Sequence, residues 1–348
     1  MVFPGTALKW CFLFFTVMNK EKIIRTVRTY LLPLAIVTGC IIYSAFHFLA
    51  FLSPLKPYVA VTLDKAIPWF IFTMLFVSFC KVEVKQMKPH RWHFYLIVLQ
   101  TVICVACTFI IRSFPQAGFA LPLEGFLVCV ITPTAAAAAV IGGKLGGNES
   151  SLTSYMLMSN VLSAILIPLL FPLISDNGET FWHEFSIIVP RVFPMIVLPL
   201  FLGLFVRYFV RRLHHFIVNK CKDLAFYLWG ITLVSVTGEA LRCIVNSDES
   251  GFMLIMLAFS GLISCAVQFA VGKLVGHQEG QRVTAGQGFG QKNMVFGVWT
   301  AFTYLSPAAA ISPGTYVLWQ NIVNGFQMWY RTRWNENRAK EGLEPYQE

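Results

Sequence analysis

The sequence predicts an all-α integral membrane protein of ten transmembrane helices, arranged as two inverted five-helix repeats with two crossing, broken helices. Hydrophobic residues make up 56% of the 348 residues, charged residues only 13%, and the mean hydropathy is +0.64. A soluble domain of this length does not need so much apolar surface. Apolar windows long enough to cross a hydrocarbon layer of about 30 Å recur along the whole chain. Basic residues cluster at alternate ends of these windows.

The apolar windows follow one another with short gaps that leave no room for a domain outside the membrane. They lie at about 29–51, 61–80, 93–113, 119–143, 151–174, 187–210, 224–246, 252–275, 282–305 and 309–330. We therefore expect a first repeat over 29–174 and a second over 187–330. A cytoplasmic or interfacial segment at 1–28 and a cytoplasmic tail at 331–348 flank them.

A further apolar run at 8–18 is too short to span a bilayer. It has a weakly basic start, and no small-residue cleavage site precedes Lys20. We interpret the run as an interfacial segment, and a signal peptide stays open as the alternative.

The basic residues fix the orientation of the ten spans. With an even number of spans, 21 of the 27 Lys and Arg residues fall on the side that holds both termini, and five fall on the opposite side. Cytoplasmic loops carry such an excess, so we expect both termini in the cytoplasm and the chain in the cell membrane. The net charge of +10 then reflects topology rather than nucleic-acid binding.

Each half has five spans, an odd number, so the second half enters the membrane from the opposite face and the halves form an inverted repeat. Matching polar residues in the two halves support this arrangement. The third spans each contain a lone glutamine, and the fifth spans each contain an asparagine that lies 28 residues after a polar residue of the preceding span. The matched residues are Gln100 and Gln268, and the pairs Thr132 with Asn160 and Asn293 with Asn321.

The fourth and ninth spans are interrupted. In the fourth, Pro133 removes a backbone donor just before five alanines at 135–139. In the ninth, Gly286, Gly288 and Gly290 permit a non-helical backbone and a close approach of helices. Interrupted helices in corresponding halves of a membrane protein predict a binding site at the bilayer midplane.

The ninth span also contains a lysine, Lys292, at the interruption. A buried ammonium costs about 2.5–3.5 kcal/mol even on lenient insertion scales, which indicates a function. The alternative is that Lys292 lies nearer the span end and snorkels to the interface.

Half-helix N-termini at such a crossing attract an anion, and half-helix carbonyls hold a cation. We expect neutral amides and hydroxyls to complete the site. The candidate substrate- and ion-binding residues are Lys292, Gln287, Gln291, Asn293, Thr132, Thr134, Gln100, Gln268, Asn160 and Asn321. As the alternative, each of these amide side chains only forms a hydrogen bond that holds two helices together.

Other residue patterns argue against enzyme chemistry. The polar set lacks the nucleophile and base of a hydrolase. No group of His, Cys and carboxylates has metal-ligand spacing, and Cys104 and Cys107 are read as small packing residues. We expect no enzyme activity and no cofactor beyond a coupling ion, either Na⁺ or H⁺. The expected partners are the lipid bilayer and a small solute. Aromatic residues near span ends are interpreted as interfacial anchors: Trp92, Tyr95, Trp329 and Tyr330.

Three stretches resemble the bile acid:sodium symporter family, with this chain as a divergent, bacterial-type member. The stretch KVEVKQMKPHRWHFYLIVLQ at 81–100 is similar to the junction of the family's second and third helices. TPTAAAAAVIGGKLGGNESSLTSYMLMSNVLSAILIPLLFPL at 132–173 and GQKNMVFGVWTAFTYLSPAAAISPGTYVLWQNI at 290–322 also resemble it. The resemblance implies a panel domain of spans one, two, six and seven. A core domain of the other six spans would contain the crossing helices and move in alternating access.

The chain departs from the family's sodium-site pattern. Gln287 stands where sodium-coupled members place a glutamate, and their Gln-Asn pair is split here as Gln291-Lys292-Asn293. The family's polar pair after the proline of the fourth helix falls at Ala138 and Ala139, whereas its third-helix glutamine is kept as Gln100. One anionic group is lost and one cation is gained.

We therefore expect a secondary active transporter of a small organic anion that does not use the family's two-sodium coupling. Two alternatives stay open. One is a sodium-coupled symporter of bile-acid-like or carboxylate solutes. The other is a transport fold that acts as a membrane sensor or assembly partner.

Overall fold

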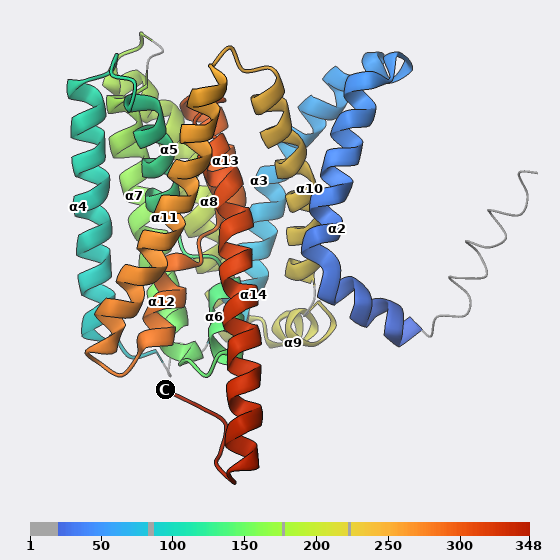
Figure 1. The fold of residues 1–348 in the computed structure, drawn as a ribbon, viewed down its shortest axis with the longest axis vertical. Coiled ribbons are helices and arrows are strands. Elements are labelled where there is room, and N and C mark those ends of the chain that lie inside the picture. The colour runs from blue at the N-terminus through green and yellow to red at the C-terminus, as the bar shows by residue number, and fades with distance from the viewer. Residues whose placement is uncertain (1–19, 83–86, 176–177, 222–223) are drawn as a thin grey trace, which may run out of the picture.

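The computed structural model describes residues 20–82, 87–175, 178–221 and 224–348, and all regular elements among them are helices (Figure 1). The predicted interfacial segment at 8–18 lies outside the described residues. The helices are α2 (Lys20–Phe48), η1 (Ala50–Leu55), α3 (Lys56–Cys80), α4 (Arg91–Ser113), α5 (Ala120–Ile131), α6 (Ala137–Lys144), α7 (Glu149–Leu170), η3 (Phe171–Leu173), α8 (Phe181–Phe209), α9 (Arg211–Lys220), α10 (Leu224–Val245), α11 (Gly251–His277), α12 (Arg282–Gly290), α13 (Met294–Tyr304) and α14 (Ile311–Lys340).

Six of the described helices are long and apolar enough to cross a membrane, so the protein is a multi-pass membrane protein. They are α3, α4, α7 with η3, α8, α10 and α11. Three shorter apolar helices are Leu34–Phe48 within α2, α5 and α13.

The two faces of α4 show how such a helix sits in lipid. One face buries Leu96, Gln100 and Cys104 inside the bundle. The other exposes large apolar side chains one turn apart: Phe94, Val98, Val102, Val105 and Phe109, which is 71% exposed. Lipid rather than water is the solvent that suits this face.

Each of the ten predicted windows coincides with one helix or with two consecutive helices. Helix α14 corresponds to the tenth window but is not among the six apolar helices, although it has 30 residues. It carries Gln320, Asn324 and Gln327 one turn apart, and these side chains face the interior of the bundle. The polar side chains of α14 therefore form part of the site described below.

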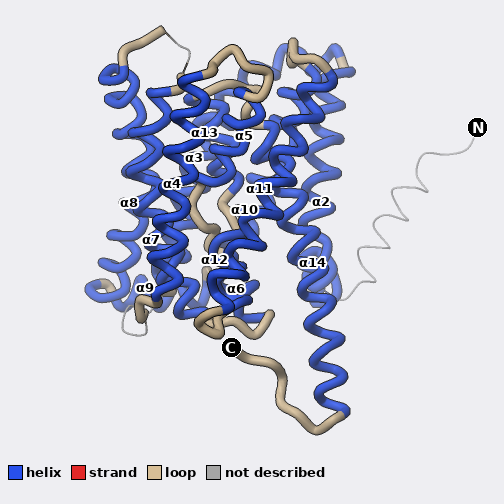
Figure 2. The backbone as a smooth tube through the Cα atoms, turned by 60° about the vertical axis from the view of Figure 1, so that its left-hand side comes forward, coloured by secondary structure: helices blue, strands red, loops and turns tan. Residues whose placement is uncertain are grey.

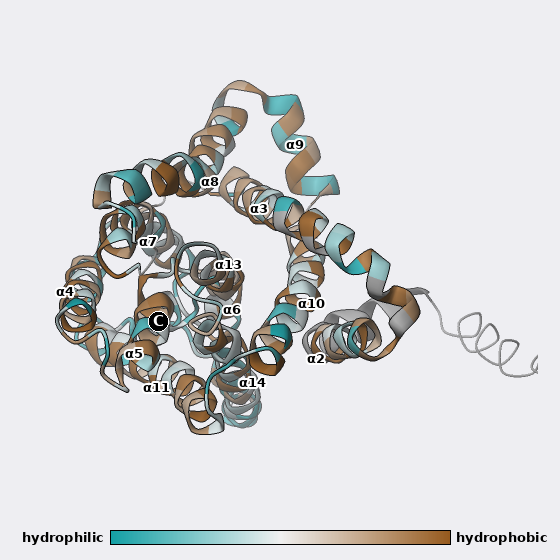
Figure 3. Ribbon diagram, turned by 90° about the horizontal axis from the view of Figure 1, so that it is seen from above, coloured by the Kyte–Doolittle hydropathy of each residue, from teal (hydrophilic) through white to brown (hydrophobic). Residues whose placement is uncertain are grey.

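The helices form two groups. One is a row in which α2 packs on α10, α10 on α3 and α3 on α8, as the view from above shows (Figure 3). The other group contains α4, α5, α6, α7, α11, α12, α13 and α14, with α11 packed against α5, α12 and α14. The grouping matches the panel and core that the family resemblance implies.

The fourth and ninth windows are broken at the predicted interruptions. Helix α5 ends at Ile131 and α6 begins at Ala137, and α12 ends at Gly290 and α13 begins at Met294. Figure 2 shows both breaks as loop segments halfway along the molecule. At 1.5 Å per residue, α5 is about 18 Å long, too short to cross a bilayer without its partner α6.

One local expectation is wrong, and one helix lies outside the predicted windows. The basic stretch after α8 is a helix, α9, because its apolar residues lie three and four positions apart and Ile217 packs inward. Trp92 is not an interfacial anchor, since it is fully buried and its indole donates a hydrogen bond to Gln281. Tyr95, Trp329 and Tyr330 are each more than half exposed, as anchors should be.

The basic segments of the described chain share one end of the molecule, which we call the basic end. The start of α2, helix α9, the α6–α7 turn and the α11–α12 turn all lie there, at the bottom of Figure 1. The segment after α14 returns to the same end.

Candidate functional site

The two broken helices meet at their interruptions. Thr134 and Lys292 form an isolated antiparallel bridge. The amide of Ala135 donates to the carbonyl of Gln291, and the amide of Asn293 donates to the carbonyl of Pro133, both at 2.8 Å. Each break thus satisfies the backbone groups that the other frees, as burial in a membrane protein requires.

The side chains at this bridge repeat the same two-fold relation. Thr134 Oγ1 donates to the carbonyl of Gly288 at 2.7 Å, and Lys292 Nζ donates to the carbonyl of Val130 at 3.1 Å. Gly288 lies four residues before Lys292, and Val130 lies four residues before Thr134. The two breaks are therefore locally equivalent, although one donor is a hydroxyl and the other an ammonium.

The equivalence extends to α7 and α14, which follow the two broken helices. The amide of Thr134 donates to Ser159 Oγ at 3.1 Å, and the amide of Lys292 donates to Gln320 Oε1 at 3.2 Å. The next residue on each helix is an asparagine that donates to the carbonyl four residues earlier, at 2.7 Å in both cases: Asn160 to Met156, and Asn321 to Val317.

The last carbonyls of α5 are capped by side chains from three other helices and by Lys292. Gln268 Nε2 donates to Cys129, Gln100 Nε2 and Lys292 Nζ donate to Val130, and Ser163 Oγ donates to Ile131. A helix C-terminus carries about half a negative charge. The ammonium of Lys292 therefore lies where the local field favours a cation.

Lys292 is fully enclosed at this place. It is 1% exposed, and its Nζ lies 5.1 Å from the centre of the Phe289 ring. Among the described residues, no carboxylate forms an ion pair with it. The alternative that Lys292 snorkels to the interface is therefore wrong.

Within the described part of the chain, the corresponding end of α12 is bonded by hydroxyl groups. Its carbonyls at Gly288 and Gly290 accept from Thr134 Oγ1 and from the Tyr316 hydroxyl, at 2.7 and 2.8 Å. The crossing thus has a lysine at the end of α5 and hydroxyl groups at the end of α12.

Amide side chains join α12 to α14 beside the crossing. Gln287 Nε2 donates to Asn324 Oδ1 at 3.0 Å, and Asn324 Nδ2 donates to Gln291 Oε1 at 2.6 Å. Four buried amide oxygens have no donor within the described part of the chain: Oε1 of Gln100, Gln268 and Gln287, and Oδ1 of Asn160. Such oxygens are acceptors suited to a hard cation or to a polar solute.

The structure brings most of the predicted residues to one crossing. Those that bridge different elements are Lys292, Gln287, Gln291, Asn293, Thr134, Gln100 and Gln268. Thr132, Asn160 and Asn321 instead bond to carbonyls of their own helices. Pro133 lies in the break, as predicted.

The prediction that the backbone is non-helical at Gly286, Gly288 and Gly290 is wrong: Gly286 and Gly288 lie inside α12, Gly290 is its last residue, and none of them has a positive φ. They are needed for close packing: a Cβ at Gly290 would lie 2.4 Å from the Phe269 ring, and one at Gly288 would lie 3.0 Å from Tyr155. The actual break covers Gln291, Lys292 and Asn293.

Five side chains of the crossing were not among the predicted site residues: Ser159, Ser163, Tyr316, Gln320 and Asn324. The signal for three of them was present, since Tyr316, Gln320 and Asn324 are polar and one turn apart in a largely apolar window. That periodicity indicates one polar helix face rather than scattered hydrogen-bonding residues.

A separate cavity of about 700 Å³ lies between the two groups of helices, against α3, α8 and α13. Four aromatic side chains contribute to its lining: Trp69, Phe72, Trp299 and Phe302. Arg191 is the charged residue among the lining residues. The cavity therefore offers an apolar wall and one cation.

Comparison with protein-family models assigns the chain to a family. A comparison with curated proteins finds no match. The model of the Sodium Bile acid symporter family matches residues 68–247, which is more than half of the chain. The match begins within α3 and runs to the end of α10, so it includes the first break and ends before the second. The chain therefore belongs to the sodium bile acid symporter family, a family of membrane transporters.

Proposed function

We propose that this protein is a secondary active transporter of a small organic anion, in which Lys292 stands in the place of a coupling cation. Ten spans form two inverted repeats, and both termini lie in the cytoplasm of a cell whose plasma or inner membrane holds the protein. The reciprocal bonding of Thr134 and Lys292 at equivalent positions supports the repeat.

The observation that carries the proposal is the bond from Lys292 Nζ to the carbonyl of Val130. A coupling cation at a broken-helix crossing binds to helix-terminal carbonyls and amide oxygens, and the ammonium takes this place at the end of α5. Two unit charges about 4 Å apart repel by about 4 kcal/mol at an effective dielectric constant near 20. A sodium ion and a charged Lys292 therefore exclude each other from this half of the site.

The cavity with Arg191 supports an organic anion as the solute. An arginine offers a planar fork of donors that matches a carboxylate or sulfonate, and the four aromatic rings suit an apolar body. The cavity lies between the row of α2, α10, α3 and α8 and the other helices. A solute bound there is exposed to opposite sides as the two groups move.

The alternative is a sodium-coupled symporter of bile-acid-like solutes. One observation favours it: the orphan amide oxygens of Gln100, Gln268 and Gln287 are suited to a hard cation. In this case a proton leaves Lys292 before sodium enters. If Lys292 instead replaces the coupling cation, transport is coupled to a proton that Lys292 binds and releases, or it is not coupled to any ion.

Uptake by the purified protein in liposomes tests the function. Organic anions of increasing apolar size are offered with and without a sodium gradient. We expect saturable uptake that does not need sodium. Arg191→Gln should raise the half-saturation concentration roughly tenfold, since bonds to charged groups contribute about 1.5–3 kcal/mol. Arg112→Gln, at the exposed end of α4, is the matched control and should not change it.

The two alternatives give different results in the same experiment. Uptake that requires sodium supports the sodium-coupled alternative. No flux of any anion, in liposomes where the protein is correctly folded, indicates a sensor or assembly partner and contradicts the transport proposal.

A further inference from the structure

The segment 341–348 folds back from the end of α14 onto the basic end of the molecule. Arg338 Nε donates to the carbonyl of Glu344 at 2.8 Å, and the amide of Tyr346 donates to Asn335 Oδ1 at 3.2 Å. The Tyr346 ring stacks on Trp334 with 5.6 Å between ring centres. These contacts direct the segment toward α12.

The side-chain carboxylate of Glu348 caps the N-terminus of α12. Its Oε1 accepts from the amide of Val283 at 2.6 Å, and its Oε2 accepts from the amide and the hydroxyl of Thr284 at 3.0 and 2.8 Å. The amide of Glu348 donates to the carbonyl of Gly146 in the α6–α7 turn at 2.7 Å. A helix N-terminus is a natural anion site, and Glu348 occupies this one.

Arg331 gives independent support for an anion site here. The residue is only 9% exposed, and its buried Nη1 has no hydrogen-bond partner among the residues that the structure describes. Its guanidinium lies 4.0 Å from the centre of the Tyr346 ring and within electrostatic range of Glu348. A buried guanidinium donor without an acceptor indicates a ligand that supplies more acceptor oxygens than one carboxylate does.

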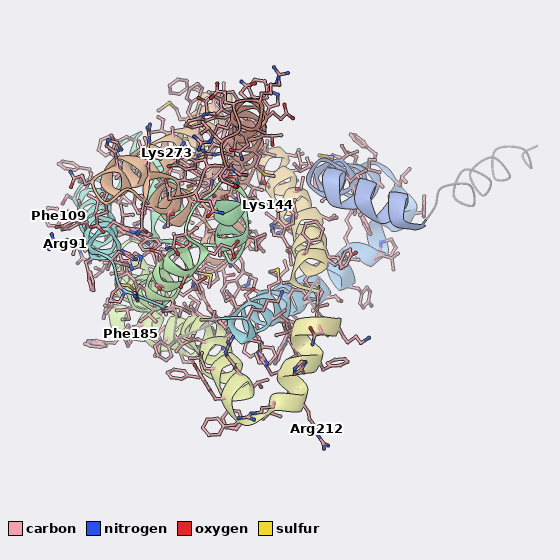
Figure 4. The ribbon with its side chains drawn as sticks, turned by 90° about the horizontal axis from the view of Figure 1, so that it is seen from below. Arg91, Phe109, Lys144, Phe185, Arg212 and Lys273 are labelled. Atoms are coloured by element: carbon pink, nitrogen blue, oxygen red, sulfur yellow. The ribbon has the colours of Figure 1, made fainter. Side chains whose placement is uncertain are left out.

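Further basic side chains lie near Arg331 and at the start of α12. Lys273 lies within electrostatic range of both Arg282 and Arg331, and Figure 4, drawn from below, labels it where α11 and α14 adjoin. Glu279, the nearest other carboxylate on the α11–α12 turn, lies beside His90 instead. Glu348 thus caps the positive end of α12 with the Arg331 guanidinium within electrostatic range.

We propose that the N-terminus of α12, together with Arg331, Arg282 and Lys273, binds a phosphate group, and that Glu348 is its internal competitor. A phosphate monoester carries roughly −1.5 to −2 charges and three acceptor oxygens. It can take the amides and hydroxyl that Glu348 now holds and also accept from Arg331 Nη1. Free phosphate compounds and phospholipid headgroups present the same chemistry, and the site lies at the end of the molecule where both are within reach.

Binding of inorganic phosphate tests the site directly. The full chain is placed in phosphatidylcholine nanodiscs, and radiolabelled phosphate is titrated at constant ionic strength. Glu348→Gln should bind phosphate roughly tenfold more tightly than the wild type, because a tethered competitor acts at millimolar effective concentration. Glu344→Gln makes the same charge change in the same segment away from the site, and it should bind as the wild type does. Adding Arg331→Gln to Glu348→Gln should remove most of the gain.

Nanodiscs that contain phosphatidic acid distinguish the two sources. If phosphatidic acid raises the melting temperature of Glu348→Gln more than that of Glu344→Gln, the ligand is a lipid headgroup. A response to dissolved phosphate alone identifies a soluble ligand, and both results support the proposal. Two results would contradict the proposal. In the first, Glu348→Gln responds to dissolved phosphate and to phosphatidic acid no more strongly than Glu344→Gln does. In the second, Glu348→Gln keeps its tighter phosphate binding when Arg331 is also replaced. The melting temperature of each variant without ligand checks that it is folded.

Discussion

Thr134 and Lys292 face each other across the crossing of the two broken helices, and each donates its side chain to the carbonyl four residues before the other. The geometry is shared, but the donors differ in charge. Corresponding positions at the two breaks thus hold a hydroxyl at the end of α12 and a lysine amine at the end of α5. This difference places a basic side chain at one break and a neutral hydroxyl at the other.

Replacing Thr134 tests the neutral half. Thr134→Val keeps the shape but removes the donor to Gly288, which leaves a buried carbonyl unpaired. The cost should be about 1–3 kcal/mol, seen as a lower melting temperature in detergent, and Thr134→Ser should restore most of it. Thr153→Val is the control, because the Thr153 hydroxyl bonds to its own helix at an exposed position. Equal melting temperatures for Thr134→Val and the wild type would show that this bond contributes nothing.

The packing role of the α12 glycines gives a second prediction. Gly290→Ala places a methyl group 2.4 Å from the Phe269 ring, so we expect a loss of about 1–3 kcal/mol of stability and reduced transport. Gly325→Ala on α14 is the control, since nothing lies within 4 Å of its new methyl group. That change should leave stability unchanged or raise it by up to about 1 kcal/mol. Equal effects of the two substitutions would contradict a packing role for Gly290.

The orientation in the membrane is tested by reporter fusions. A reporter that works only in the cytoplasm should be active after Asn219, at the end of α9, and after Glu348. It should be silent after Glu179 and after Ser247, at the opposite end of the bundle. An active reporter after Ser247, or a silent one after Glu348, is incompatible with ten spans and cytoplasmic termini.

Much of the fold could be predicted because a bilayer leaves a strong signal in the sequence. Apolar windows of span length located the helices, and Pro133 and Lys292 marked both breaks. The short helix α9 was missed because its ten residues are mostly basic and polar, and its apolar periodicity is brief. The polar face of α14 was underestimated because it faces protein rather than lipid.

The site could be predicted only as a set of residue types. The sequence places Lys292 at an interruption, but it does not show that Val130, 162 residues earlier, accepts its bond. The glycines of α12 were assigned to the break because glycine is compatible both with irregular backbone and with close helix packing, and only the neighbours decide between these roles. Here the neighbours are Phe269, Tyr155 and Trp92.

The role of Lys292 as a fixed cation is tested most directly by the sodium dependence of substrate affinity. The measurement titrates substrate binding against sodium at constant ionic strength, because added salt alone screens charge interactions. We expect wild-type affinity to change little with sodium. Lys292→Ala should weaken anion binding on the order of tenfold, and sodium should partly restore it, since the carbonyl of Val130 then lacks its cation. The double variant Gln287→Glu with Lys292→Ser should bind substrate in a sodium-dependent way. A steep, saturable sodium dependence in the wild type that Lys292→Ala leaves unchanged would contradict the account.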